Sequence, residues 1–227
     1  MSRSKPENIA KVKVWDLPIR LFHWGLVAAI ATSWISMELE NMEVHVISGA
    51  CVLGLLIFRV LWGIWGASTA QFHRFIPSPM RLIAYLKNTA AENLKSIGHS
   101  PLAALSVIAM LAAIAFQVLT GLVSDDDVYT TGPLIEYVES DFSEWATGMH
   151  STNSDILLGL MALHIAAIMF YKFVKKRRLI KPMITGSSDE HASEDSVINP
   201  LVERSMVVFL LTAAISGAIS YGIFNWL

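Results

Sequence analysis

The sequence predicts an all-α integral membrane protein, in which a four-helix bundle is followed by a fifth, C-terminal transmembrane helix. Three observations lead to this prediction. Hydrophobic residues make up 54% of the 227 residues and charged residues only 16%, whereas a soluble domain is about one quarter charged. Five apolar stretches approach or exceed the ~20 residues that a helix needs to cross a bilayer. Most of the charged residues lie between these stretches.

The apolar stretches set the expected order of the elements along the chain. They cover residues 18–37, 44–66, 100–123, 150–173 and 205–226. The first stretch is rich in Trp and Phe and is followed at once by another span, so we expect it to be retained rather than cleaved as a signal peptide. We divide the chain into a four-helix domain (1–180), a polar loop (181–204) and a fifth helix (205–227).

Two segments outside these spans have patterns of their own. In residues 67–98 the chain is broken by Pro77 and Pro79. The part at 81–97 mixes apolar and basic residues, which is typical of an amphipathic helix lying at the membrane surface. Residues 183–200 are polar and predict a mobile loop.

The charges predict how the protein is oriented in the membrane. Segments 38–43 and 124–149 together hold ten acidic residues and no Lys or Arg. Basic residues gather at the N-terminus, in 67–98 and in YKFVKKRRLIK after the fourth span. The positive-inside rule places the N-terminus in the cytoplasm and the C-terminus outside. Tryptophans near span ends are expected at the membrane interface: Trp15, Trp24, Trp62, Trp65, Trp145 and Trp226.

Four histidines fall at two depths of the predicted bundle. His150 and His164 bound the stretch HSTNSDILLGLMALH in the fourth span. Fourteen residues of helix rise about 21 Å and miss whole turns by about 40°, so both lie on one helix face. His45 matches the outer depth and His23 the inner depth. We call His45 and His150 the outer pair, and His23 and His164 the inner pair.

Two imidazole pairs in a helix bundle favour two haems, each with two axial histidines. A proton relay and ordinary packed histidines remain alternatives, because ionisable groups at membrane depth are functional in several ways. A single zinc site is excluded, since its ligands must cluster and these pairs stand about 20 Å apart. The one cysteine, Cys51, allows no intrachain disulfide, and there is no CxxCH motif for covalent haem attachment.

Two arginines are candidates for contact with such a cofactor. Arg59 follows His45 by fourteen residues and therefore shares its helix face. Arg20 lies one turn before His23. Either guanidinium suits a haem propionate, and either equally suits lipid head groups at the interface.

Two further residues carry weaker expectations. Gly49, one turn from His45, either makes room for a flat macrocycle or serves ordinary close helix packing. His99, at the start of the third span, is either part of a quinone pocket near the inner pair or a helix-start residue.

Four stretches together resemble the bacterial cytochrome b561 and nickel–iron hydrogenase b-type cytochrome family. They are WDLPIRLFHW, HVISGACVLGLLIFRVLWGIWG, GHSPLAAL with a later LTGL, and HSTNSDILLGLMALH, and the resemblance spans about residues 12–180. It implies four transmembrane helices in the bacterial inner membrane that hold two non-covalent b haems. By motif, His23 and His164 would bind the inner haem iron, and His45 and His150 the outer one.

The resemblance also implies electron transfer between the quinone pool and a partner at the outer face, either a periplasmic c-type cytochrome or a hydrogenase. The second span has one histidine, whereas the hydrogenase subunits often have another there, and a fifth span is present. Both departures leave the partner open. Three roles remain open for the fifth helix: it could mediate a homodimer, bind a partner subunit or simply cover the bundle.

The acidic outer segments suit a basic protein partner, although the positive-inside rule alone also explains them. Two other functions remain alternatives. An oxidoreductase of small molecules such as superoxide is disfavoured by these acidic segments, which would repel an anion. The other alternative is a haem-free membrane protein, either a scaffold or a transporter. The lack of internal repeats disfavours the transporter. We expect no nucleic-acid partner.

Overall fold

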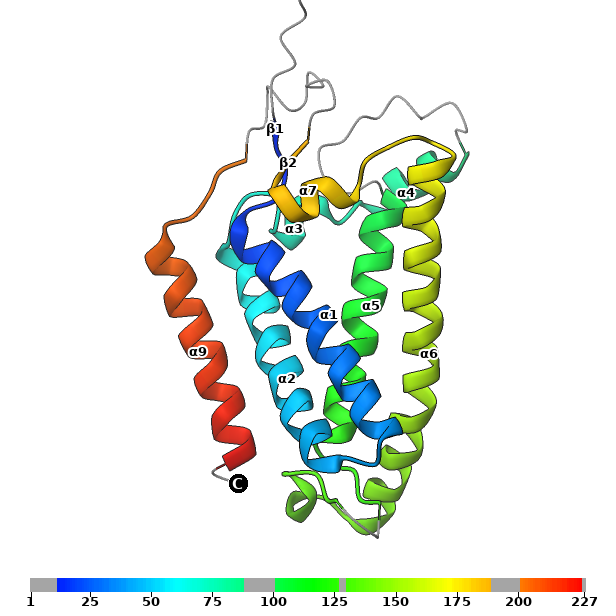
Figure 1. Ribbon diagram of the computed structural model, residues 1–227, viewed down its shortest axis with the longest axis vertical. Coiled ribbons are helices and arrows are strands. Elements are labelled where there is room, and N and C mark those ends of the chain that lie inside the picture. Colours follow the sequence, from blue (N-terminus) through cyan, green and yellow to red (C-terminus); the bar gives the residue numbers. More distant parts are fainter. Residues whose placement is uncertain (1–11, 88–100, 127–129, 189–200, 226–227) are drawn as a thin grey trace, which may run out of the picture.

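The computed structural model describes residues 12–87, 101–126, 130–188 and 201–225. Five long helices lie within the described residues, and Figure 1 shows that they run side by side. They are α1 (Leu17–Glu38), α2 (Met42–Trp65), α5 (Pro101–Gly121), α6 (Ser140–Phe173) and α9 (Met206–Asn225). The predicted all-α membrane bundle, with four core helices and a fifth at the C-terminal end, is confirmed.

Four of these helices, α2, α5, α6 and α9, are long and apolar enough to cross a membrane. The first helix, α1, has 22 residues, which is about 33 Å and matches the ~30 Å hydrocarbon core. It is less apolar because Arg20, His23 and Glu38 lie within it. It packs along α2 as part of the same bundle.

Helices α1 and α2 form a tight antiparallel hairpin. Asp16 caps α1 by accepting a hydrogen bond from the backbone N–H of Ile19 at 3.2 Å. At the other end, Glu40 takes the left-handed backbone conformation with φ 55°. Asn41 then caps α2 by accepting from the N–H of Val44 at 3.2 Å. The turn therefore brings the end of α1 beside the start of α2.

Helix α6 begins ten residues before the apolar stretch 150–173 and ends with it. It runs from Ser140 to Phe173 and has 34 residues. The Ser143 hydroxyl donates to the carbonyl of Val123 at 2.8 Å. The Thr147 hydroxyl accepts from the N–H of Asp125 at 3.0 Å. These contacts hold the polar first turns of α6 against the chain that leaves α5, which a hydropathy pattern does not detect.

Short elements cover the opposite end of the bundle from the α1–α2 and α5–α6 connections (Figure 1). They are α3 (Phe72–Phe75), α4 (Pro79–Lys87), α7 (Ile180–Thr185), β1 (Val12–Lys13) and β2 (Ser187–Ser188). The strands pair antiparallel. Helix α4 covers the first part of the predicted surface helix, and residues 88–97 lie outside the described residues.

The predicted mobile loop at 183–200 was wrong for its first residues. Residues 183–188 complete α7 and form β2. The Arg20 guanidinium donates to the carbonyl of Ile184, and the Trp24 indole donates to the carbonyl of Met183 at 3.2 Å. Side chains of α1 thus satisfy carbonyls at the end of α7, and this long-range pairing was not visible in the polar sequence. Residues 189–200 lie outside the described residues.

Trp62 is a core residue, so its predicted place at the lipid interface was wrong. Its side chain is 0% exposed. The indole N–H donates to the Asp16 carboxylate at 2.9 Å, and the ring packs against Phe58 at 5.6 Å and Phe209 at 6.2 Å. The capping carboxylate of α1 supplies the polar partner that allows the indole to be buried. Trp226 lies outside the described residues.

Helix α9 packs against α2 through small polar side chains. Thr212, Ser216 and Ser220, spaced four residues apart, are all buried. The Ser220 hydroxyl donates to the carbonyl of Ala50 at 2.6 Å, and the Trp65 indole donates to the Thr212 hydroxyl at 3.1 Å. Small residues let helix backbones approach closely in a membrane, so α9 is a packed part of the bundle.

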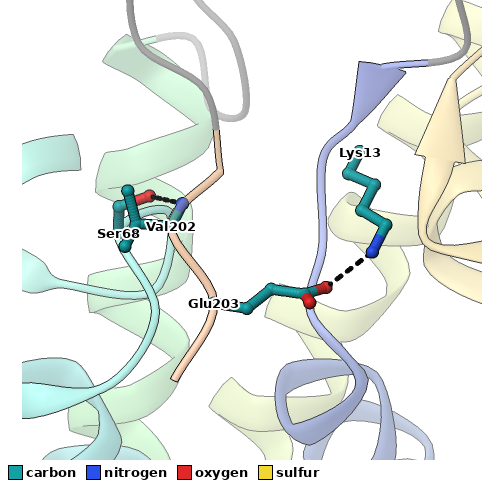
Figure 2. A network of polar contacts seen from close by, with 4 residues as sticks. All are labelled: Lys13, Ser68, Val202 and Glu203. Carbon is teal, nitrogen blue, oxygen red and sulfur yellow. Dashed lines mark hydrogen bonds and ion pairs between the residues drawn. The ribbon is translucent and has the colours of Figure 1, made fainter. Parts of the chain in front are cut away.

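The chain leading into α9 is held by two contacts shown in Figure 2. The backbone N–H of Val202 donates to the Ser68 hydroxyl at 2.9 Å. Lys13 and Glu203 form an ion pair at 3.2 Å, with side chains 65% and 50% exposed. An ion pair this exposed stabilises a protein by no more than about 1 kcal/mol.

Candidate functional site

The outer pair comes together between two helices. His45 near the start of α2 and His150 in α6 have ring centroids 6.2 Å apart and planes at 77° to each other. Metal–imidazole bonds are 2.0–2.1 Å long, so two rings that bind one ion from opposite sides have centroids about 6 Å apart. Both side chains are half-buried. The separation therefore fits one metal ion between the rings.

Each ring of the outer pair is oriented by a backbone carbonyl of a neighbouring helix. The Nδ1 of His45 lies 3.0 Å from the carbonyl oxygen of Ser33 in α1. The Nδ1 of His150 lies 2.9 Å from the carbonyl oxygen of Gln117 in α5. Because a carbonyl only accepts, each Nδ1 carries the proton, and each Nε2 keeps its lone pair. Such hydrogen bonds are the usual means of setting a metal-binding histidine.

A glycine of α5 gives the His150 ring its place. A Cβ at Gly121 would lie 2.7 Å from Cε1 of His150, which is closer than real side chains approach. Gly121 belongs to the LTGL stretch, but the sequence did not identify it, or Ser33 and Gln117, as part of the site. The one available signal was Gln117 itself, since a polar side chain within an apolar span is expected to have a role.

The inner pair is contributed by α1 and α6. His23 and His164 are both half-buried, and their imidazoles lie within electrostatic reach of each other. Nδ1 of His23 is buried and has no hydrogen-bond partner among the described residues. The ring meets Trp24 edge to face at 5.0 Å. A buried imidazole nitrogen normally has a partner, so this atom fits a site completed by a bound group.

Arg59 is 4% exposed and cannot reach lipid head groups. Its guanidinium lies 4.5 Å from the ring centre of Phe72 and 5.7 Å from that of Phe75. Nη1 has no hydrogen-bond partner among the described residues. The nearby Asp16 is also buried, and burial raises the pKa of its carboxyl above the ordinary value. A buried guanidinium with a free N–H fits an anionic group from a bound molecule.

The remaining predicted residues have separate surroundings. Arg20 contacts α7 through Ile184, and its buried Nε has no partner in the described part of the chain. A Cβ at Gly49 would meet no atom within 4 Å, so open space adjoins the helix face next to His45. His99 lies outside the described residues.

A groove of about 1510 Å³ opens along the side of the bundle, between α1, α2 and α9. Its walls are mostly apolar, and none of the four histidines lines it. The groove is therefore separate from both histidine pairs.

Comparison with known proteins agrees with this arrangement. The profile of the prokaryotic cytochrome b561 family matches residues 14–186, which contain α1 to α7 and both histidine pairs but not α9. No curated protein and no solved structure gives a significant match. Because the match covers well over half of the 227 residues, the chain belongs to the prokaryotic cytochrome b561 family, whose members are integral membrane proteins that bind b-type haem and transfer electrons.

Proposed function

We propose that this cytochrome carries electrons across the membrane, between the quinone pool and a periplasmic redox partner, through two b haems. His45 and His150 bind the outer haem, and His23 and His164 bind the inner one. When bound, each haem supplies reversible one-electron exchange at an iron whose potential depends on its ligands and surroundings. The observation that carries the proposal is the 6.2 Å separation of the outer imidazoles, with both Nδ1 atoms facing carbonyls.

Helix α6 links the two sites. It supplies His150 to one pair and His164 to the other, and the fourteen residues between them rise about 21 Å. One continuous helix therefore sets the spacing of the two sites along the membrane normal. The partner histidines come from the opposite ends of the α1–α2 hairpin, so both sites lie between this hairpin and α6.

The two arginines act as partners for the haem carboxylates. Nη1 of Arg59 and Nε of Arg20 are buried, and neither atom has a hydrogen-bond partner among the described residues. A charge-assisted hydrogen bond from either would neutralise a propionate that would otherwise be expensive to bury. Both belong to the inner end, one near the end of α2 and the other near the start of α1.

The N-terminus faces the cytoplasm and α9 ends in the periplasm of a bacterial inner membrane. The acidic connections α1–α2 and α5–α6 lie at one end of the bundle (Figure 1). The end covered by α3, α4 and α7 carries the basic segments. This distribution follows the positive-inside rule. Residues 1–180 form the four-helix cytochrome domain, with 181–204 as connection and 205–227 as an added helix.

Quinone reacts near the inner haem, and a soluble protein docks near the outer one. Thr69 and Gln71, in the chain after α2, each have a buried side-chain oxygen without a hydrogen-bond partner among the described residues, which suits a polar ligand head at this end. The acidic outer segments favour a basic c-type cytochrome over a hydrogenase as partner.

Counting haem in the purified protein tests this function. A pyridine haemochrome assay should find two b haems per chain. Changing any one of His23, His45, His150 or His164 to Ala should leave one. His73→Ala removes an exposed histidine of α3 and should leave two. A wild-type protein without haem, or an unchanged haem content in His150→Ala, would refute the proposal.

A further inference from the structure

Gln117 of α5 contacts the turn of α6 that bears His150 through three polar groups: its backbone carbonyl and both atoms of its side-chain amide. Its carbonyl accepts from His150 Nδ1 at 2.9 Å. Its side-chain Nε2 donates to the backbone carbonyl of His150 at 2.9 Å. Its Oε1 accepts from Asn153 Nδ2 at 2.6 Å. Asn153 is 6% exposed and also donates to the carbonyl of Ala113 at 2.9 Å.

These contacts bind the two helices in two different ways. The carbonyl of Gln117 holds the imidazole, whereas its amide holds the main chain of His150 and the side chain of Asn153. The first contact selects the ring tautomer and plane. The second fixes where α6 sits, in rotation and height, against α5. Polar groups buried among apolar helices are costly unless satisfied, and here donor and acceptor are both used at one turn.

We propose that Gln117 is a positioning residue for the outer haem, and that its side-chain amide, together with Asn153, sets the orientation of the His150 imidazole. The inference rests on the proposed function, because it assigns His150 as a ligand. Among the described residues, no side chain of another helix bonds to the main chain of His45: its carbonyl accepts from the Ser48 hydroxyl of its own helix at 2.8 Å, and its Nδ1 lies near the carbonyl and, at 3.3 Å, the hydroxyl of Ser33. The clamp by a side chain of a neighbouring helix is therefore found at the His150 ring, on the α5 side of the outer pair.

Gln117→Leu tests the amide alone, because the variant keeps the backbone carbonyl and most of the side-chain volume. The measurements are redox potentiometry and the low-spin ferric EPR signal of each haem, which responds to the relative orientation of the axial imidazole planes. We expect the outer haem to change its EPR signal and midpoint potential while the inner haem keeps both. The inner haem thus reports within the same molecule that the bundle is folded.

Ser154→Ala is the matched control. The Ser154 hydroxyl donates to the carbonyl of Ser151 within α6 at 2.7 Å, so its loss removes a hydrogen bond one turn from His150 without touching α5. Both haems should behave as in the wild type. The length-swapped double variant Gln117→Asn with Asn153→Gln keeps both amides, and we expect it to restore part of the outer signal.

The outcomes separate the two claims. If the wild type holds two haems and His150→Ala removes the outer one, but Gln117→Leu matches the wild type in EPR and potential, the positioning role is wrong and the proposed function stands. If His150→Ala leaves the outer haem in place, both are wrong. If Gln117→Leu fails to fold, Asn153→Leu and the swapped variant decide. Unchanged outer signals in Asn153→Leu, or no recovery in the swap, would overturn the inference.

Discussion

The outer and inner histidine pairs share one plan and differ in their surroundings. Each takes one ligand candidate from α6, and all four side chains are half-buried. In the outer pair both Nδ1 atoms face a helix carbonyl. In the inner pair Nδ1 of His23 has no partner in the described part of the chain. Two sites with the same ligand type are thus given different hydrogen bonds.

The charges near the two pairs also differ: they are negative near the outer pair and positive near the inner pair. The connections beside the outer pair are acidic, and Arg59 and Arg20 lie toward the inner end. A carbonyl that accepts from a ligand imidazole makes it a stronger donor, and nearby negative charge favours the ferric iron. A nearby guanidinium favours the ferrous iron. Both effects lower the potential of the outer haem relative to that of the inner haem.

The largest effect is expected from filling the open space at Gly49, beside the outer pair. A side chain at Gly49 meets no atom within 4 Å, so Gly49→Leu should fold and yet occupy the room of the outer macrocycle. We expect the haem content to fall from two to about one. Overpacking costs of 1–3 kcal/mol correspond to roughly 5- to 150-fold in affinity.

The control for Gly49→Leu is Gly217→Leu in α9. This position is also open to 4 Å, but it faces the lateral groove rather than a histidine pair. Two haems should remain. Haem is measured by the haemochrome assay and normalised to folded protein. Equal haem loss in both variants would show that added side-chain volume anywhere in the bundle displaces haem, and would contradict a specific space at Gly49.

Docking at the acidic end should depend on salt. Reduction of a basic c-type cytochrome is expected to slow on the order of tenfold or more as salt rises, because electrostatic steering contributes 10- to 1000-fold to association rates. Glu139→Gln with Glu144→Gln removes two exposed carboxylates and should flatten that dependence. Glu203→Gln, at the opposite end, should leave it unchanged. Stopped-flow rates that ignore salt would contradict docking at this end.

The redox titration of the wild type should show two steps, with the outer haem reduced at the lower potential. The assignment comes from His150→Ala, in which the lower step should disappear, and from His164→Ala, in which the higher step should disappear. The reverse assignment would mean that burial, rather than the hydrogen bonds and charges compared above, sets the order.

The smallest expected effect is a shift confined to the inner haem. Arg59→Gln removes a buried positive charge, so the inner potential should fall while the outer potential stays. Arg59→Lys keeps the charge but lacks the planar fork. Its inner-haem potential should lie between those of the wild type and Arg59→Gln. A shift of both potentials, or a shift of the outer haem alone, would place Arg59 elsewhere in the electrostatics of the protein.

Much of the architecture followed from patterns repeated along the chain. Hydropathy identified the five helices, and the helical repeat put His150 and His164 on one face of α6. Pairing of His45 with His150 also followed, because depth in a membrane limits which residues can meet. These inferences depend on local composition and on the bilayer, and neither requires knowledge of the packing.

Three features depended on contacts between residues far apart in the sequence. The early start of α6, the burial of Trp62 against Asp16 and the order at residues 183–188 each rest on hydrogen bonds across 20 to 164 positions. Gln117 belongs to the same group, since its role depends on α6 packing beside α5. The sequence by itself determined the helices, their order and the position of each histidine along its helix, because these follow from hydrophobicity and helix geometry. Only the tertiary structure decided which carbonyls orient the histidines, because a hydrogen bond between helices depends on the exact rotation of both.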